Sequence, residues 1–320
     1  MDETLRLDEE LRCGIVLAGQ DSDTTKRQSQ RAEALGFDSL WVGDHVAFHV
    51  PIAESLTTLA FAAGATERIA LGTAVYLLAL RHPTHVAKIT ATLDRLSGGR
   101  LVLGVGLGGE FPPEWQAVGV PVAERASRVE ESIPLVRRLW SEDRVAHAGR
   151  HFAFDPVTIA PKPNPQRASG AAGPPPIWIG GRAPAAMRRA GRLADGYISH
   201  MCAPETYRSN LDTIAASARE AGRASLAFGS AAFLFTFLEQ RVEDAHEKAA
   251  KLLGMVYARD FREAARKYCL LGPPDACLEK MRAFARAGCR HFILAPLSDP
   301  ESFAERVAAE ILPSVRTLAT

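Results

Sequence analysis

Short apolar runs alternate with longer segments of helical period along nearly the whole chain, and this alternation restricts the fold more than any other feature of the sequence. The runs are rich in β-branched and apolar residues and are bounded by turn-forming residues, as strands are. They lie at residues 13–19, 37–44, 69–76, 100–106, 176–181, 195–199, 226–238 and 289–296. Strands that alternate with helices indicate βα units and a parallel sheet. The sequence therefore predicts an α/β protein with a (β/α)8 TIM barrel rather than a doubly wound sheet.

The helix expected after the third run illustrates the helical period. It begins at Pro83, since proline at the first helical position costs no backbone hydrogen bond. Glycines 98 and 99 are expected to end it. Its apolar positions have 3-4-3 spacing, which predicts a stripe that faces the sheet. These positions are Val86, Ile89, Leu93 and Leu96.

One segment interrupts the alternation. Residues 141–176 have no sustained period, and seven prolines lie between positions 156 and 176. We expect an insertion between the fourth and fifth strands that is partly loop and partly a short hairpin around residues 147–154. No internal repeat or second domain is evident, so residues 1–320 are expected to form a single domain.

Charge and cysteine content exclude several classes of function. The 38 basic and 37 acidic residues nearly cancel, and no basic cluster is interleaved with aromatic residues as a nucleic-acid site requires. The five cysteines are scattered, without a CxxC pair or zinc-finger spacing, so we expect reduced thiols and no metal site. The partner is therefore expected to be a small molecule.

The sequence also argues against membrane insertion. The first twelve residues are acidic where a signal peptide would be basic, and the longest mostly apolar run has 12 residues, too few to span a bilayer. A cytoplasmic protein without a membrane partner is expected.

In a TIM barrel the chemistry lies at the carboxyl ends of the strands, so these positions are the candidate site. The run "SLWVGDHV" ends in Asp44 and His45, two groups that a core would not accept. Asp44 could instead cap the next loop, and His45 could be a half-buried histidine bonded to a carbonyl. Their position at a strand end favours function. Other candidates at strand ends are Ala18, Thr73, Ala74, Gly106, Leu107, Glu110 and His200.

The stretch "IGGRAPAAM" leads from a strand into a helix. The first N–H groups of a helix have no internal partner, so Gly180, Gly181, Arg182 and Ala183 are expected to bind a phosphate. The alternative is a glycine turn needed only for packing. Arg81 and His82 precede Pro83 and are interpreted as a loop anchor outside the catalytic set.

Three stretches together resemble the bacterial luciferase-like oxidoreductases, which are flavin- and deazaflavin-dependent barrels. They are "ALGFDSLWVGDHV", "RIALGTAVYLLALRHPTHVAKITATLDRLSGGRLVLGVG" and "PPIWIGGRAPAAMRRAGRLADGYI". The resemblance runs from about residue 13 to 296. It implies an often dimeric barrel that holds the cofactor ring in its mouth and the cofactor phosphate at residues 180–183. It also implies a non-proline cis peptide at the end of the third strand, here Thr73–Ala74.

The deazaflavin branch of this family is similar at the second strand, where an Asp-His pair places the acid near the cofactor and the histidine near the substrate. The matching residues are Asp44 and His45. Sugar-phosphate dehydrogenases of that branch carry a glutamate soon after the fourth strand, whereas this chain has Leu107 there and Glu110 three residues later. This departure weighs against a sugar phosphate. The largely apolar residues 46–55 instead indicate a neutral organic substrate.

The leading hypothesis is an oxidoreductase that moves hydride between coenzyme F420 and a small organic substrate. His45 is the expected proton donor or acceptor, because a free imidazole titrates near neutrality. Two alternatives remain open: an FMN-dependent monooxygenase that uses reduced flavin and oxygen, and a non-catalytic flavin-binding barrel. The sequence does not define the substrate or the direction of hydride transfer.

Overall fold

The computed structural model describes residues 5–223 and 225–318. The chain divides into two compact units, which are described separately below. Unit 1 comprises the chain up to Trp41 together with the chain from Gly181 onward, and unit 2 comprises Val42–Gly180. In the described residues, no helix combines the length and the apolar character that a membrane span needs.

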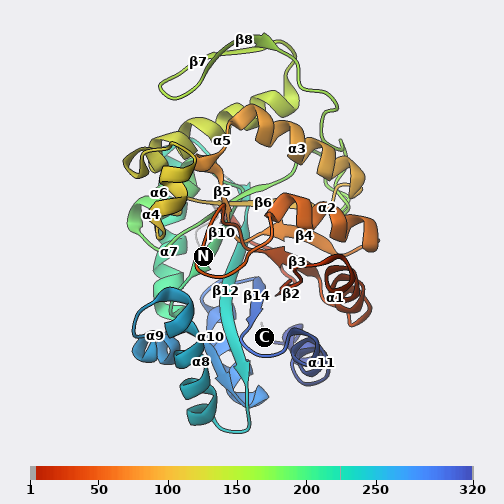
Figure 1. Cartoon of the computed structure of the whole chain (residues 1–320), viewed down its shortest axis with the longest axis vertical. Coiled ribbons are helices and arrows are strands. Elements are labelled where there is room, and N and C mark those ends of the chain that lie inside the picture. The colour runs from red at the N-terminus through yellow and green to blue at the C-terminus, as the bar shows by residue number, and fades with distance from the viewer. Residues whose placement is uncertain (1–4, 224, 319–320) are drawn as a thin grey trace. The chain divides into compact units, whose positions relative to one another are not determined.

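Unit 1 is built on parallel strands in the order β3-β2-β14-β12-β10 (Figure 1). Their bounds are β2 Arg12–Val16, β3 Ser39–Val42, β10 Gly196–His200, β12 Gly229–Leu238 and β14 His291–Pro296. The short strand β13 (Leu270–Gly272) pairs with the end of β12. A separate parallel pair joins β1 (Leu5–Arg6) to β11 (Leu226–Ala227).

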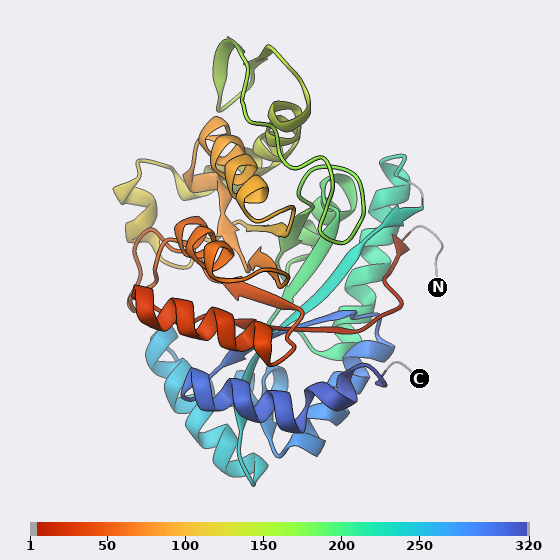
Figure 2. The ribbon, with the colours of Figure 1, turned by 90° about the vertical axis from the view of Figure 1, so that its right-hand side faces the viewer.

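Helices follow the strands of unit 1 along the chain. They are α1 Ser22–Ala34, α6 Pro184–Leu193, α7 Pro204–Glu220, α8 Val242–Tyr257, α9 Arg262–Tyr268, α10 Pro274–Arg286, α11 Pro300–Glu310 and α12 Leu312–Val315. Asp21 caps α1 by accepting the N–H of Thr24, and Gly36 follows its end with φ +87°. Helices α1 and α11 lie side by side (Figure 2). The ion pair Arg27–Glu301 joins them at 2.6 Å.

Unit 2 centres on β6 (Leu101–Gly106), which pairs in parallel with β4 (Ala70–Thr73), β5 (Tyr76–Leu77) and β9 (Ile177–Gly180). Its helices are α2 Ser55–Ala65, α3 Pro83–Leu96, α4 Pro112–Ala117 and α5 Arg125–Ser141, with 3-10 turns at Leu78–Leu80 and Val122–Glu124. Each of the eight predicted runs contains a strand. The predicted third run is interrupted, because β4 ends at Thr73 and β5 begins at Tyr76.

The insertion contains the hairpin that was predicted. It consists of β7 (Val145–Ala148) and β8 (Ala153–Val157), which pair antiparallel. Figure 1 shows this hairpin projecting beyond α5. Glu131 of α5 holds it, since its carboxylate accepts the backbone N–H groups of His151 and Phe152 and lies 3.0 Å from Nε2 of His147.

Helix α3 buries a different face from the predicted one. Val86 and Leu93 are buried as expected, but Ile89 is 48% exposed and Leu96 is 73% exposed. The buried face also holds Ala87, Thr90, Ala91 and Asp94. The prediction that Ile89 and Leu96 face the sheet was therefore wrong.

The physical reason is a buried ion pair. Asp94 lies at 0% exposure, where its carboxylate accepts hydrogen bonds from Arg167 at 2.5 Å and from the backbone N–H of Asn164 at 2.9 Å. A buried carboxylate is tolerated only when it is paired and hydrogen-bonded. The insertion supplies both donors, so the polar position is buried and the apolar Leu96 faces outward.

A hydrogen-bonded histidine lies in the core of unit 1. Trp41 donates its indole N–H to the hydroxyl of Ser39 at 2.7 Å, and that hydroxyl lies 2.6 Å from Nε2 of His291. Burial lowers the pKa of His291 to about 3, with a smaller contribution from Arg12. The imidazole is therefore neutral, and its Nε2 accepts the Ser39 hydrogen.

His291 makes the stability of the fold depend on pH. Between about pH 6.5 and pH 3 the unfolded chain binds a proton at this residue that the folded chain does not bind. The free energy of unfolding should therefore fall as the pH falls, by about 1.4 kcal/mol per pH unit for this group. Urea unfolding of the parent and of His291→Gln at pH 7, 6 and 5 measures the effect. The difference in the free energy of unfolding between the parent and the variant should become smaller as the pH falls. A difference that stays the same at all three pH values would contradict the prediction.

Candidate active site

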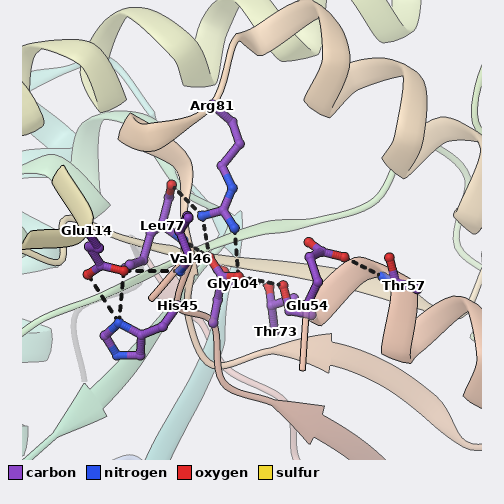
Figure 3. Close-up of polar contacts among 11 residues, drawn as sticks. His45, Val46, Glu54, Thr57, Thr73, Leu77, Arg81, Gly104 and Glu114 are labelled. Atoms are coloured by element: carbon purple, nitrogen blue, oxygen red, sulfur yellow. Dashed lines mark hydrogen bonds and ion pairs between the residues drawn. The ribbon is translucent and has the colours of Figure 1, made fainter. Parts of the chain in front are cut away.

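Asp44 follows strand β3 and is completely buried. Arg81 binds both oxygens of its carboxylate, at 2.5 and 2.9 Å. The hydroxyl of Ser55 donates to Oδ1 at 3.1 Å, and the backbone N–H of Leu77 donates to Oδ2 at 2.8 Å. Figure 3 labels Arg81 and Leu77, two of the residues that make these contacts. The Asp44 carboxylate thereby links the end of β3 to β5, to the start of α2 and to Arg81, which lies just before α3.

The four donors occupy the acceptor positions of the Asp44 carboxylate. The cofactor contact implied for Asp44 by the resemblance therefore stays a prediction, and the contacts in unit 2 make Asp44 a positioning residue. Arg81, interpreted from the sequence as a loop anchor, is the functional partner that sequence reasoning missed. The signal was available: an acid at the end of a buried strand needs a cation nearby.

Arg81 is itself held in place. Its guanidinium lies 4.4 Å from the centre of the Tyr76 ring, and it also donates to the carbonyl of Leu77. Burial raises the pKa of Tyr76, an effect that the positive charge of Arg81 partly offsets. The Tyr76 hydroxyl therefore stays protonated and neutral at physiological pH.

His45 forms a pair with Glu114, a residue of α4. The Glu114 side chain is completely buried, and its two oxygens lie 3.1 and 3.2 Å from Nδ1 of His45 (Figure 3). It also accepts the backbone N–H of Val46 at 3.1 Å. An ionised carboxylate can only accept, so Nδ1 carries the hydrogen and Nε2 is the basic nitrogen. The imidazole remains 20% exposed.

Aromatic side chains cover part of His45. The ring of Phe48 stacks on the imidazole with 4.0 Å between centres and 15° between planes. Phe48 also contacts Phe111 edge-on, and Phe111 contacts His49. One face of the imidazole is thus apolar and its Nδ1 is occupied, which leaves Nε2 and the opposite face for other partners.

The predicted cis peptide lies one residue further along the chain. The non-proline cis bond is Ala74–Val75, not Thr73–Ala74. Thr73 is completely buried and its hydroxyl donates to the carbonyl of Gly104, so it belongs to the strand core and the chain departs from the sheet only after it. The bond matched by the resemblance was therefore wrong by one position, because the strand continues through Thr73 and the chain leaves the sheet one residue later.

Val75 explains two of the predicted glycines. A Cβ added at Gly106 would lie 2.3 Å from the Val75 side chain, and one at Gly180 would lie 2.6 Å from it. Both positions therefore require glycine so that the backbone can lie against Val75. This half-buried valine was not among the predicted residues, yet it supplies an apolar surface beside the cis bond.

Glu110 is exposed, and Leu107 is half-buried. The glutamate bonded to His45 is not Glu110, the predicted pocket residue, but Glu114. The completely buried Trp115 follows it and anchors α4 in unit 2. The sequence offered no local signal for this pairing, because adjacent residues of a helix point in different directions and the burial of Trp115 does not imply that of Glu114.

The turn before α6 has features suited to an anion. Gly180 ends β9, and in unit 1 the residues Gly181, Arg182 and Ala183 precede Pro184, the first residue of α6. The N-cap residue Ala183 offers no side-chain cap. The N–H of Gly181 already donates to the carbonyl of Ile198 at 3.3 Å, so this group is not part of an open nest. The phosphate role of the turn stays a prediction.

The remaining predicted residues lie in unit 1. Ala18 is exposed and its backbone N–H donates to the side chain of Gln28. His200 ends β10, where its ring lies 5.7 Å from Phe233 and 6.0 Å from Phe235. Unit 2 by itself brings together Asp44 and His45 with two partners that were not predicted, Arg81 and Glu114.

Comparison with known proteins defines the class. Residues 9–291 match the family described as luciferase-like monooxygenase, and the chain belongs to that family, as the resemblance predicted. A curated relative, the F420-dependent glucose-6-phosphate dehydrogenase of Nakamurella multipartita, is 31% identical over 317 residues, which cover 90% of this chain and 91% of that protein.

Solved structures confirm the predicted fold. An F420-dependent secondary alcohol dehydrogenase in complex with an F420-acetone adduct matches with a TM-score of 0.82 at 23% identity, over 96% of this chain and 99% of that one. The F420-dependent tetrahydromethanopterin reductase of Methanopyrus kandleri matches with a TM-score of 0.77 at 21% identity, over 96% and 99%. The fold is a (β/α)8 TIM barrel.

The buried Asp44 carboxylate should make Arg81 important for stability. Arg81→Ala leaves that charge without its cation, which typically costs about 3–5 kcal/mol. Arg138 of α5, in a partly exposed pair with Glu142, is the matched control, and its replacement by Ala should cost less than about 1 kcal/mol. Urea unfolding measures both variants. Asp44→Asn should recover part of the loss in the Arg81→Ala background, whereas equal losses for the two arginine variants would contradict the assignment.

Proposed function

We propose that this protein is an F420-dependent oxidoreductase that transfers hydride between coenzyme F420 and a small organic substrate. The observation that carries the proposal is the His45–Glu114 pair, which holds an imidazole after strand β3 with Nε2 available for a proton. The relative from Nakamurella multipartita, named as an F420-dependent dehydrogenase, supports the choice of cofactor. FMN is the alternative cofactor and is an outcome of the test below.

The residues present fit such a cofactor. Val75 lies against Gly106 and Gly180 and offers an apolar surface beside the Ala74–Val75 bond, against which a flat ring can pack. The first N–H groups of α6 have no side-chain cap, and helix N-termini favour phosphate. A Cβ at Gly181 would lie 2.6 Å from the methyl group of Ala186, so the turn must stay glycine. Arg182 and Ala183 would complete the phosphate site.

When bound, F420 supplies the hydride chemistry, and the protein supplies position and a proton path. His45 exchanges a proton with the substrate oxygen through Nε2. Glu114 keeps the hydrogen of the neutral ring on Nδ1 and stabilises the imidazolium when Nε2 is protonated. Phe48 covers one ring face and excludes water from it. The network around Asp44 holds the end of β3 so that His45 is presented in one orientation.

We also infer that the two units form one domain, because the family match spans residues of both.

A homodimer is supported by apolar side chains that lie exposed on neighbouring helices of unit 2, namely Phe61 of α2 with Ile89 and Leu96 of α3. Such residues are commonly covered by a partner chain. A cytoplasmic location stays a prediction.

Cofactor titration tests the proposal. A deazaflavin behaves as an obligate hydride carrier that needs a ring site and a proton source, and the His45–Glu114 pair meets the second need. The purified protein should bind F420 at micromolar or lower concentration and FMN much more weakly, as measured by fluorescence. Tighter binding of FMN, with oxygen consumption when reduced FMN and substrate are added, would replace the proposal with a monooxygenase. Failure to bind either cofactor would contradict both the F420-dependent oxidoreductase and the FMN-dependent monooxygenase.

Turnover should depend on His45 and Glu114 as one unit. His45→Ala should lower kcat by about 10² to 10⁴ while F420 binding is retained, because proton transfer is lost. Glu114→Gln should also lower kcat, and the double variant should be no slower than His45→Ala alone, since Glu114 acts through the imidazole.

The matched controls are His49→Ala and Glu110→Gln, which change an exposed imidazole and an exposed carboxylate of neighbouring loops. Both should retain most of the parent kcat. Additive losses in the double variant would show that Glu114 does not act through His45, and a normal kcat for His45→Ala would return that histidine to a structural role.

A further inference from the structure

One face of the His45 imidazole is packed against an aromatic ring. The centre of the Phe48 ring lies 4.0 Å from the centre of the imidazole, and the two planes differ by 15°. This distance and this angle describe a stacked pair of rings. Aromatic rings in contact prefer particular mutual orientations. The stack therefore restrains the plane in which the imidazole lies.

The histidine by itself does not fix the plane of its ring. The χ2 torsion of a histidine has a broad energy profile, so the ring can turn about the Cβ–Cγ bond at little cost. The carboxylate oxygens of Glu114 lie 3.1 and 3.2 Å from Nδ1 of His45 and hold one edge of the ring. A hydrogen bond is lost steeply only at donor angles below about 120°, so this contact alone permits the ring to rock. Glu114 thus selects the edge of the imidazole that faces it, and Phe48 selects the plane.

Helix α4 supports Phe48 in turn. The ring of Phe111, the N-cap residue of α4, meets Phe48 edge-on with 5.8 Å between centres and 80° between planes. Glu114 lies three residues later, and its backbone N–H donates to the carbonyl of Phe111 at 3.3 Å. The completely buried Trp115 anchors this turn of helix in unit 2. One short helix therefore supplies both the carboxylate that lies against Nδ1 and the ring that supports Phe48.

The segment that carries Phe48 is tied to the same carboxylate. The backbone N–H of Val46 donates to Oε2 of Glu114 at 3.1 Å (Figure 3). The His49 ring lies 4.5 Å from that of Phe111 and 5.1 Å from that of Phe48. The segment is thus held through its backbone and through its rings. We call Phe48 and Phe111 the aromatic clamp.

We propose that Phe48 is a positioning residue for proton exchange at His45 and that Phe111 acts through it. This inference rests on the proposed function, in which Nε2 of His45 exchanges a proton with the substrate. The lone pair of Nε2 lies in the plane of the ring, so rotation about χ2 turns it away from the reacting oxygen. A misplacement of about 1 Å can cost about 100-fold in rate. The aromatic clamp keeps the imidazole in the plane from which the proton can pass.

Nuclear magnetic resonance tests the stack without any substrate. The nine histidine rings are labelled with carbon-13, and the Cε1–H signal that is lost in His45→Gln is assigned to His45. A hydrogen above the face of a benzene ring is shielded, so this signal should move downfield when Phe48→Leu removes the ring. Phe48→Tyr keeps a ring and should leave the signal near its parental position. Unchanged signals from the other histidines show that each variant is folded.

Turnover tests the consequence for the reaction. Reduction of F420 is followed by its loss of absorbance, with 2-propanol and glucose-6-phosphate as alternative probes. Phe48→Leu should lower kcat by about 10- to 100-fold and leave KM within about 2-fold of the parent, because orientation is lost and binding is not. Phe48→Tyr should restore most of the parental kcat. The matched control is Phe154→Leu, which changes a half-buried phenylalanine of β8 whose ring lies 6.1 Å from that of His147, and it should leave kcat unchanged.

A double variant tests the support that Phe111 gives. Phe111→Leu should lower kcat less than Phe48→Leu does. The double variant should be no slower than Phe48→Leu alone, since Phe111 acts through Phe48. Additive losses would contradict the role assigned to Phe111.

The outcomes separate this inference from the proposed function. Protein that does not bind F420, or that keeps a normal kcat in His45→Ala, overturns the proposed function and the inference with it. Protein that binds F420 and depends on His45 overturns the inference alone if Phe48→Leu has the parental kcat or an unmoved His45 signal. A Phe48→Tyr or Phe154→Leu variant as slow as Phe48→Leu also overturns it. Where neither probe is oxidised, a His45 signal that moves in Phe48→Leu but not in Phe48→Tyr supports the inference, and an unmoved signal overturns it.

Discussion

The completely buried carboxylate of Asp44 is the constraint on which the arrangement of unit 2 depends. A charge removed from water must be compensated, and here a bidentate arginine, a hydroxyl and a backbone N–H provide the compensation. These donors come from the beginning of α2, from β5 and from the segment that leads into α3. Satisfying one acid therefore orients three separate parts of the chain, and the residue that follows it, His45, receives its orientation from the same network.

Two buried acids near the end of β3, Asp44 and Glu114, bind different partners. Asp44 accepts hydrogen bonds from Arg81, Ser55 and the backbone of Leu77. The carboxylate of Glu114 instead lies against the imidazole of His45. The two carboxylates differ in their partners: Asp44 binds an arginine, which is always charged, whereas Glu114 binds a histidine. The adjacent Asp44 and His45 thus have different partners, although their proximity in the sequence suggests a single pair.

Two apolar features of unit 2 are fixed by close packing. Val75 requires glycine at Gly106 and Gly180, so that the backbone can lie against its side chain. Phe48 stacks on the imidazole of His45 and contacts Phe111 edge-on. The charges of Asp44 and Arg81 are paired with each other. A charge placed beside apolar side chains without such a partner is costly, which is the physical reason why Asp44 needs Arg81.

The sequence by itself determined the succession of strands and helices, since the periods of 2 and 3.6 residues are local properties, and the barrel followed from their number and order. The rule that barrel chemistry lies at strand ends also located His45. Only the tertiary structure decided which groups meet it. Glu114 lies 69 residues from His45 and Arg81 lies 37 residues from Asp44, so no local pattern links them. The same holds for α3, where pairing of Asp94 with Arg167, 73 residues away, turned a polar position inward and left Leu96 outside. Hydrophobic spacing describes how a helix or strand can bury apolar surface, but the partners of a buried charge are chosen by the fold, because they must reach it through space.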